Sequence, residues 1–318
     1  MTKQIPKRGS SRTTVRQTYL ALSVIVVALG VILSRLPERI EQDTSITDDY
    51  PDMAIDREIR ELDPSTQPGT GLDAQGDGAV EVAIAQGDEA IDPPDPIPLY
   101  IIVDDVGNNI EPLLRFLELP MALTFAVLPQ RTYTTQSIEL IEATGNPPIL
   151  HQPMEAIGSN DPGEGALMDG MTRIEVHETL EKNLEAFPSI LGINNHMGSL
   201  VTSNLEMMRH VMQFLNERQM YFIDSATTER SVAGQAAAEL GVKFGRRTGV
   251  FLDNEDNVES VRAAIESSLD QARSDGEAIL IGHVQSATLF EVLAEEAASI
   301  VERGYTFKHI SEYPFISN

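Results

Sequence analysis

The sequence predicts an α/β protein whose folded part is a parallel (β/α) barrel of seven or eight strands. From Leu99 onward, short apolar runs alternate with helical patterns, and strands separated by helices pair in parallel. Ionisable side chains follow several of the apolar runs, and a parallel barrel places such residues together on one rim. With 318 residues, of which 42% are hydrophobic, the chain can bury one large core, but not along its whole length.

The N-terminal end is predicted to be a membrane anchor. Residues 1–18 form a basic tail with five Lys or Arg and no acid, and residues 19–35 are almost wholly apolar. A basic flank before such a run is typical of a signal peptide or of an uncleaved signal anchor. We expect a transmembrane helix in the inner membrane, with the C-terminal domain in the periplasm or outside the cell. The alternative is secretion after cleavage near residues 28–30.

Residues 36–97 are predicted to be an acidic flexible linker. They hold seventeen Asp or Glu and three Arg, with Pro and Gly throughout and no sustained periodicity. Such a composition cannot bury enough apolar surface to offset the entropy lost on ordering. A partner-binding role for this linker is the alternative. Because the net charge of the whole chain is −26, we expect no nucleic-acid partner.

Residues 98–318 form the predicted domain, and each of its elements has its own pattern. Apolar runs bounded by polar or turn residues predict strands at 99–103, 122–127, 148–151, 190–194, 221–223, 250–252 and 278–281. Amphipathic periodicity predicts helices near 110–118, 134–144, 173–187, 204–218, 231–240, 256–273 and 286–303. A last apolar run at 306–310 closes the chain.

The first predicted strand ends in two adjacent carboxylates, Asp104 and Asp105. Two carboxylates this close repel each other, so a cation or a shared proton is expected there. His151, His196 and His283 also follow predicted strands, and imidazole and carboxylate are suitable ligands for zinc and similar ions. The chain has no cysteine, so a divalent metal site must use these groups. The structural alternative is a helix cap for the acids and a hydrogen-bonded core position for each histidine.

Other polar residues near predicted strand ends are candidates for supporting roles. Asp224 and Asp253 each follow a predicted strand. Arg247 could hold a carboxylate through two parallel hydrogen bonds, and the alternative is that Arg246 and Arg247 are simply two adjacent surface residues. His177 and His210 fall inside helical patterns and are expected to be solvated. The chain has no Gly-x-Ser-x-Gly elbow and no glycine-rich phosphate loop after a strand, which gives a serine hydrolase or a nucleotide-binding protein little support.

Six short segments, taken in order, resemble the divergent polysaccharide deacetylase family, a branch of the NodB-like carbohydrate esterases. The segments are IVDDVG at 102–107, LHQPME at 150–155, NNHMGS at 194–199, FIDS at 222–225, FLDN at 251–254 and IGH at 281–283. The resemblance implies a NodB-like (β/α) barrel that hydrolyses acetyl groups on glycans with a divalent metal. Zinc is the expected metal. The implied partner is an acetylated envelope polysaccharide or a peptidoglycan-type substrate.

The resemblance also implies roles for single residues. Asp104 would be the general base, and Asp105 would be a metal ligand. His196 matches the first histidine of the family's metal motif. His283 matches the late histidine that protonates the leaving group.

Two features of the sequence depart from the family's pattern. The second histidine of the metal motif falls at Leu200, and His151 from the preceding strand is the expected substitute. The family's Arg-x-Pro-Tyr loop is not recognisable, and Arg247 and Asp253 are expected to supply part of its role. These departures leave open a non-catalytic envelope protein that binds or scaffolds glycan on a degenerate barrel. The remaining predicted supporting residues are Glu155, Asn195 and Asp224.

Overall fold

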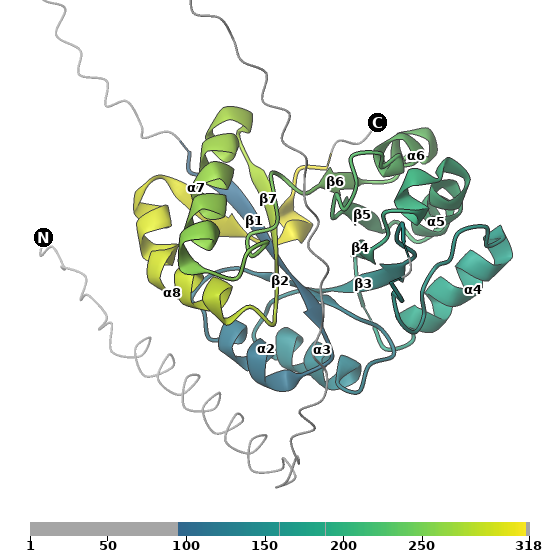
Figure 1. Ribbon diagram of the computed structural model, residues 1–318, viewed down its shortest axis with the longest axis horizontal. Helices are drawn as coiled ribbons and strands as arrows, with labels where there is room; N and C mark the ends of the chain where they lie inside the picture. The colour runs from purple at the N-terminus through teal and green to yellow at the C-terminus, as the bar shows by residue number, and fades with distance from the viewer. Residues whose placement is uncertain (1–94, 159, 188, 316–318) are drawn as a thin grey trace, which may run out of the picture. The chain divides into compact units, whose positions relative to one another are not determined.

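Eight parallel strands alternate with helices in the part of the chain that the structure describes (Figure 1). The structure is a computed structural model, and it describes residues 95–158, 160–187 and 189–315. The strands are β1 (Ile97–Val106), β2 (Thr124–Val127), β3 (Pro148–Met154), β4 (Gly192–Met197), β5 (Tyr221–Asp224), β6 (Phe244–Arg246), β7 (Ala278–His283) and β8 (Tyr305–Lys308). The helices are α2 (Ile110–Leu117), α3 (Thr134–Ala143), α4 (Arg173–Leu184), α5 (Leu205–Glu217), α6 (Ala233–Leu240), α7 (Val258–Asp275) and α8 (Ala287–Glu302), with short 3-10 turns η1 (Val201–Ser203) and η2 (Ile310–Glu312).

The strands form a nearly closed barrel, as the sequence predicts. Strands β1 to β6 are paired in chain order, and β7 pairs with the other side of β1. Between β6 and β7 the ring is completed by the segment after β6. In this segment the Thr248 N–H donates to the Ile279 carbonyl at 2.7 Å, and the Leu252 N–H donates to the Ile281 carbonyl at 2.9 Å.

Strand β8 settles whether the barrel has seven or eight strands. It pairs with Ile97–Tyr100, the first part of β1, whereas β2 pairs with β1 only from Ile102 onward. Strand β8 therefore lies below β2 on the same side of β1, and seven strands make the ring.

The prediction of the sixth strand, at residues 250–252, is wrong. The structure places β6 at Phe244–Arg246, and residues 250–252 lie in the loop that follows it. An apolar run could not mark β6, because its interior position is Gly245, where a Cβ would come within 2.8 Å of the Ile279 side chain and 2.9 Å of the Ile223 side chain. The predicted basic tail, anchor and most of the linker lie outside the described residues and stay predictions. Within residues 95–158, 160–187 and 189–315, the structure has no helix long and apolar enough to cross a membrane.

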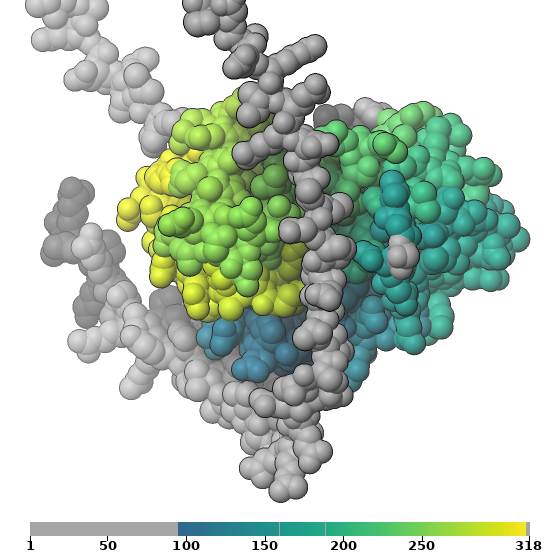
Figure 2. Space-filling model, in the orientation of Figure 1, coloured from purple at the N-terminus to yellow at the C-terminus, as the bar shows by residue number. Residues whose placement is uncertain are grey.

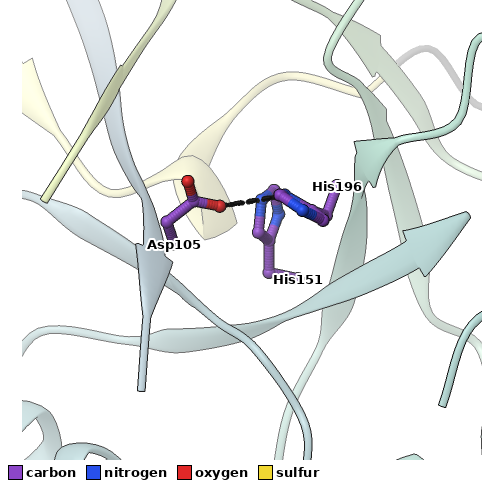
Figure 3. Close-up of side chains that lie close together, drawn as sticks. All are labelled: Asp105, His151 and His196. Atoms are coloured by element: carbon purple, nitrogen blue, oxygen red, sulfur yellow. Dashed lines mark hydrogen bonds and ion pairs between the residues drawn. The ribbon is translucent and has the colours of Figure 1, made fainter. Parts of the chain in front are cut away.

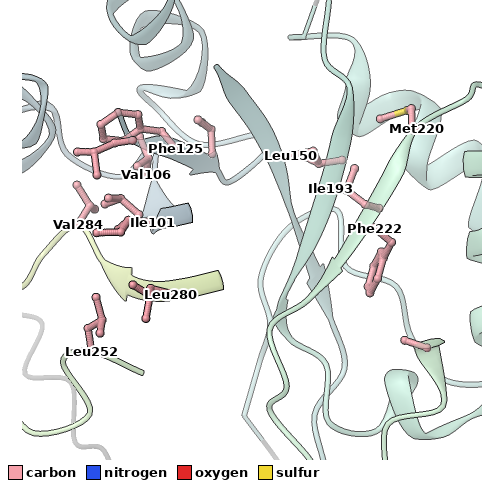
Figure 4. Close-up of a cluster of buried hydrophobic side chains, with 14 of the residues drawn as sticks. Ile101, Val106, Phe125, Leu150, Ile193, Met220, Phe222, Leu252, Leu280 and Val284 are labelled. Carbon is pink, nitrogen blue, oxygen red and sulfur yellow. The ribbon is translucent and has the colours of Figure 1, made fainter. Parts of the chain in front are cut away.

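Two apolar layers hold the barrel together. The larger layer lies between the outward faces of the strands and the helices, and Figure 4 shows strand residues of this layer, including Ile101, Phe125 and Leu150. Helices α7 and α8 cover one side of the barrel and α4 to α6 another, as the yellow-green and teal surfaces in Figure 2 show. Each large apolar side chain buried in such a layer contributes about 1.5–3 kcal/mol.

The smaller layer fills the inside of the barrel. It consists of alternate strand residues and one residue of the C-terminal segment, namely Tyr100, Ile102, Ala126, Ile149, Tyr221, Ile223, Ile279, Ile281 and Ile310. Successive side chains of a strand point to opposite faces, so the inward position that follows Ile102 is Asp104, and the one that follows Ile281 is His283. The alternation of side chains along each strand therefore places ionisable residues directly above the inner apolar layer.

Replacing Gly192 by alanine is expected to destabilise the barrel by about 1–3 kcal/mol, because overpacking of a filled core costs this much. Gly192 lies opposite Tyr221 in the β4–β5 register, and a Cβ at Gly192 would overlap the Tyr221 ring. Urea unfolding of the two proteins measures the difference. In a Tyr221→Ala background the same substitution should cost far less, and an equal cost in both backgrounds would refute this packing.

Candidate metal centre

The two carboxylates at the end of β1 reach one pocket because the backbone changes conformation between them. Asp104 continues the alternation of β1 and points into the barrel. Asp105 has a left-handed backbone, with φ of 64°, and the β1–β2 register shifts at this point. Aspartate tolerates this region better than most residues, although such strain still costs about 1–3 kcal/mol and is typical of functional sites. Met197 and Ala226, at the ends of β4 and β5, also have positive φ.

Asp105, His151 and His196 converge on the carboxyl rim of the barrel (Figure 3). The Asp105 Oδ1 atom lies 2.9 Å from His196 Nδ1 and 3.1 Å from His151 Nε2. The two imidazole nitrogens are 3.2 Å apart. Asp105 lies near the end of β1, His151 within β3 and His196 near the end of β4, and β2 lies between β1 and β3. Their meeting therefore depends on the barrel and not on sequence proximity.

The spacing of these three atoms fits a divalent cation. Zinc binds histidine nitrogen and carboxylate oxygen at about 2.0–2.2 Å in tetrahedral geometry, so neighbouring ligand atoms on one ion lie about 3.3–3.6 Å apart. The three observed separations, 2.9, 3.1 and 3.2 Å, are slightly shorter, so a small outward movement of the side chains would admit an ion. The His196 side chain is 24% exposed, which leaves one side of the triangle open, as a catalytic metal site requires.

The charges around the triangle also favour a cation. Burial by itself would raise the pKa of Asp105, but hydrogen bonds from His151 and His196 and the charge of these rings hold it well below its usual range. Burial would lower the pKa of His151, yet the charge of Asp104 and the contact with Asp105 raise it above its usual value. Positive charge is thus stabilised at this point, and a metal ion can replace the proton.

His283 and Asp253 form a second polar pair on the same rim. His283 stands beside Asp104 in the β1–β7 register, and its Nδ1 lies 3.0 Å from Asp253 Oδ1. The other Asp253 oxygen accepts the His283 backbone N–H at 2.8 Å. Burial would lower the pKa of His283, but the hydrogen bond and charge of Asp253, with smaller contributions from Asp105 and Asp104, raise it to about 9. His283 is therefore protonated at neutral pH.

One known protein family matches this chain over almost the whole barrel. The sequence profile described as divergent polysaccharide deacetylase matches residues 101–313, from β1 to just beyond η2. The chain belongs to the divergent polysaccharide deacetylase family.

The chain is also similar to two bacterial proteins in sequence and to a solved structure in fold. The uncharacterized protein YibQ of Escherichia coli strain K12 is 34% identical over 191 residues, and this stretch is 60% of each of the two proteins. A protein of Haemophilus influenzae strain KW20/Rd is 30% identical over 60% of this chain and 68% of its own length. The crystal structure of ATU2773 from Agrobacterium tumefaciens C58 has the same fold, with a TM-score of 0.65 and 18% identity over 68% of this chain and 89% of that one.

In this member of the divergent polysaccharide deacetylase family, Leu200 takes no part in the cluster. Its backbone N–H donates to the Glu155 carbonyl at the start of η1. His151, the predicted substitute for the missing histidine, lies next to Asp105 and His196.

The predicted supporting residues are placed around the site in different ways. Asp253 contacts His283 directly, whereas the Glu155 carboxylate accepts the Asp169 N–H and holds the loop after β3. Asn195 and Asp224 bond backbone groups around the ends of β4 and β5.

Arg247 is half-buried, and among the described residues it forms hydrogen bonds with backbone carbonyls and not with a carboxylate. Its guanidinium donates to the carbonyls of Ser225, Ala226 and Gly249. It also stacks on Phe251, with 4.0 Å from its central carbon to the ring centroid, and the Phe251 ring lies 5.1 Å from the His283 ring. Arg247 thus supports the wall beside His283.

Two residues of the site were not among those predicted from sequence. Asn194 lies between Asp104 and His151, and Gln285 Nε2 donates to Asp105 Oδ2 at 3.0 Å. The signal for Asn194 was available, because a side chain two positions before His196 in a strand shares its face. Asn195, the predicted supporting residue, faces the other way.

Asp253→Asn is expected to shift the alkaline limb of the pH–activity profile to lower pH by at least about one unit, because an opposite charge this close shifts a pKa by 1–3 units. If His283 donates a proton, activity is present below its pKa and is lost above it, so a lower pKa moves this loss toward neutral pH. The measurement is the activity as a function of pH. Asp256→Asn, in the same loop and without contact to His283, is the matched control. An unchanged limb in Asp253→Asn would remove His283 from proton transfer.

Proposed function

We propose that this protein is a metal-dependent deacetylase that acts on an acetylated envelope polysaccharide. The observation that carries the proposal is the convergence of Asp105, His151 and His196 on one point, with Asp104 and His283 beside it. Membership of the divergent polysaccharide deacetylase family supports the reaction class, and the donor set supports the metal.

Asp105, His151 and His196 would hold the ion, which we expect to be zinc. When bound, a divalent cation supplies Lewis acidity toward a carbonyl oxygen and favours deprotonation of a water molecule. The second oxygen of Asp105 is held by Gln285, so the carboxylate is oriented from both sides.

Asp104 is the proposed general base. Its Oδ1 accepts a hydrogen bond from Asn194 at 2.8 Å, while Oδ2 lies on the side of the ligand triangle, 3.7 Å from His151 Nε2. The side chain is 98% buried, and burial raises its pKa against the opposing charges of His151 and His283. A raised pKa brings a carboxylate nearer to the range in which it accepts a proton efficiently at neutral pH.

His283 is the proposed proton donor to the departing group. Its Nδ1 faces Asp253, which leaves Nε2 as the nitrogen that can reach a substrate. The β1–β7 register places it next to Asp104. A base and an acid thus stand side by side, and their pKa values are set by different environments.

The family supports the proposed substrate, and the N-terminal sequence is the basis for the proposed location. A glycan deacetylase anchored by residues 19–35, with the barrel outside the inner membrane, would act on an envelope polysaccharide of the peptidoglycan type. Release of the protein by cleavage of the same segment would give the same site a secreted form.

Removal of the metal is expected to abolish acetate release, and zinc is expected to restore it. The test is acetate release from acetylated peptidoglycan and from an acetylated polysaccharide, with protein treated with a chelator and then reloaded. Activity that survives complete metal removal would contradict the proposal. Tight binding of these glycans without any acetate release from the zinc-loaded protein would favour the non-catalytic alternative.

A further inference from the structure

Asn194 connects the proposed base to one of the proposed metal ligands. It is fully buried on β4, and its amide lies between Asp104 and His151. Asn194 Nδ2 lies 2.8 Å from Asp104 Oδ1 and 3.3 Å from Ser225 Oγ, and Asn194 Oδ1 lies 2.8 Å from His151 Nδ1. Every polar atom of the amide therefore has a partner.

Only one orientation of this amide satisfies its neighbours. A carboxylate can only accept hydrogen bonds, so the group that faces Asp104 must be the NH₂ of Asn194. The oxygen of the amide is then directed at His151 and can only accept. The alternative orientation would bury two oxygen atoms against each other at 2.8 Å with no hydrogen between them, and would direct the NH₂ group at His151 Nδ1.

The orientation of Asn194 determines which nitrogen of His151 carries a proton. Since Asn194 Oδ1 accepts, His151 Nδ1 must donate and hold its hydrogen. His151 Nε2 faces Asp105 and His196, and in the metal-free protein it donates to Asp105 Oδ1. When a cation replaces this proton, the ring is neutral with its lone pair on Nε2, because Nδ1 keeps its hydrogen. A ring with the opposite tautomer would direct an N–H at the ligand triangle and could not bind a cation there.

We propose that Asn194 is a positioning residue that fixes the metal-binding tautomer of His151 and, through its other end, the carboxylate of Asp104. The proposal rests on the proposed function for its purpose, but the contact itself can be tested in the protein without metal. One amide thereby links cation binding to proton transfer. The outer partner of a ligating histidine typically contributes 10–100-fold to metal affinity or activity.

Two substitutions separate the two ends of the amide. Asn194→Leu removes both contacts, and we expect zinc affinity to fall by about 10–100-fold. Asn194→Asp keeps an acceptor for His151 Nδ1 but places a carboxylate oxygen, which cannot donate, against Asp104. We therefore expect zinc binding to be largely retained while acetate release falls. Recovery of zinc binding in the aspartate variant would show that the acceptor is what matters. Equal weakening in both variants would overturn the tautomer role.

Asn183→Leu is the matched control for the loss of a buried asparagine. Asn183, on α4, is equally buried and bonds Gln130 and Gln152, away from the ligand triangle. We expect it to lower stability without a change in zinc affinity. Zinc affinity is measured by competition with a chelating dye, and a loss in Asn183→Leu as large as in Asn194→Leu would assign the effect to general damage.

NMR of the His151 ring provides a readout that needs neither metal nor substrate. We expect an exchange-protected proton on His151 Nδ1 in the metal-free protein, its persistence in the zinc-loaded protein with Nε2 as the ligating atom, and its loss in Asn194→Leu. Absence of this proton from the wild type would overturn the inference. A wild type that shows the proton but binds no zinc would refute the proposed function while the proton still supports the tautomer assignment.

Discussion

His151→Ala is expected to weaken zinc binding by at least about 100-fold, since even the outer partners of a metal ligand contribute 10–100-fold. His151 Nε2 lies within 3.2 Å of both other ligand atoms, so its loss leaves two protein ligands where a catalytic zinc site has three. The measurement is zinc affinity by competition with a chelating dye, together with acetate release at saturating zinc.

His177→Ala is the matched control for this experiment. His177 lies on α4, and its contacts are the His210 carbonyl and the Phe214 ring, not the ligand triangle. It should leave zinc affinity unchanged. If His151→Ala binds zinc as tightly as the wild type and remains folded by circular dichroism, His151 is not a ligand and Leu200 marks a degenerate site.

Asp104→Asn is expected to lower the turnover rate by about 10²–10⁴-fold, the usual contribution of a general base, with zinc affinity changed little. An asparagine at this position still accepts the hydrogen bond from Asn194 but cannot take up a proton. Its position in the barrel and the ligand triangle should therefore be retained. The measurements are the rate of acetate release and the zinc stoichiometry of the same preparation.

The contrast with Asp105→Asn makes this result specific. Asp105 is the ligand of the pair, so its substitution should lower both zinc affinity and activity, whereas Asp104→Asn should lower activity alone. If Asp104→Asn keeps full activity with bound zinc, another residue is the base. If it loses zinc to the same extent as Asp105→Asn, the two carboxylates act together as ligands.

The barrel was predictable wherever an interior position is apolar. Strands β1, β5 and β7 have Ile or Tyr on the inside and other apolar residues on the outside, so they form continuous apolar runs in the sequence. Strand β6 was missed because its inward residue must be glycine. The place of β8 below β2 could not be inferred, since pairing between distant strands leaves no local signal.

The site was predictable to the extent that ionisable residues end their strands. Asp105, His151 and His196 could be named because each follows an apolar run and the chain has no cysteine. Asn194 could also be assigned to the pocket, because it lies two positions before His196 on the same strand and therefore shares its face. The reach of Gln285 to Asp105 depends on the β7–α8 loop and is not encoded in the types of residue alone.

The most direct test of the central claim is the position of a bound metal ion. Anomalous diffraction at the zinc edge, from crystals of the zinc-loaded protein, is expected to show one strong peak about 2.0–2.2 Å from Asp105 Oδ1, His151 Nε2 and His196 Nδ1. A fully loaded crystal with no peak among these three atoms, or with its peak elsewhere on the barrel, would contradict the claim.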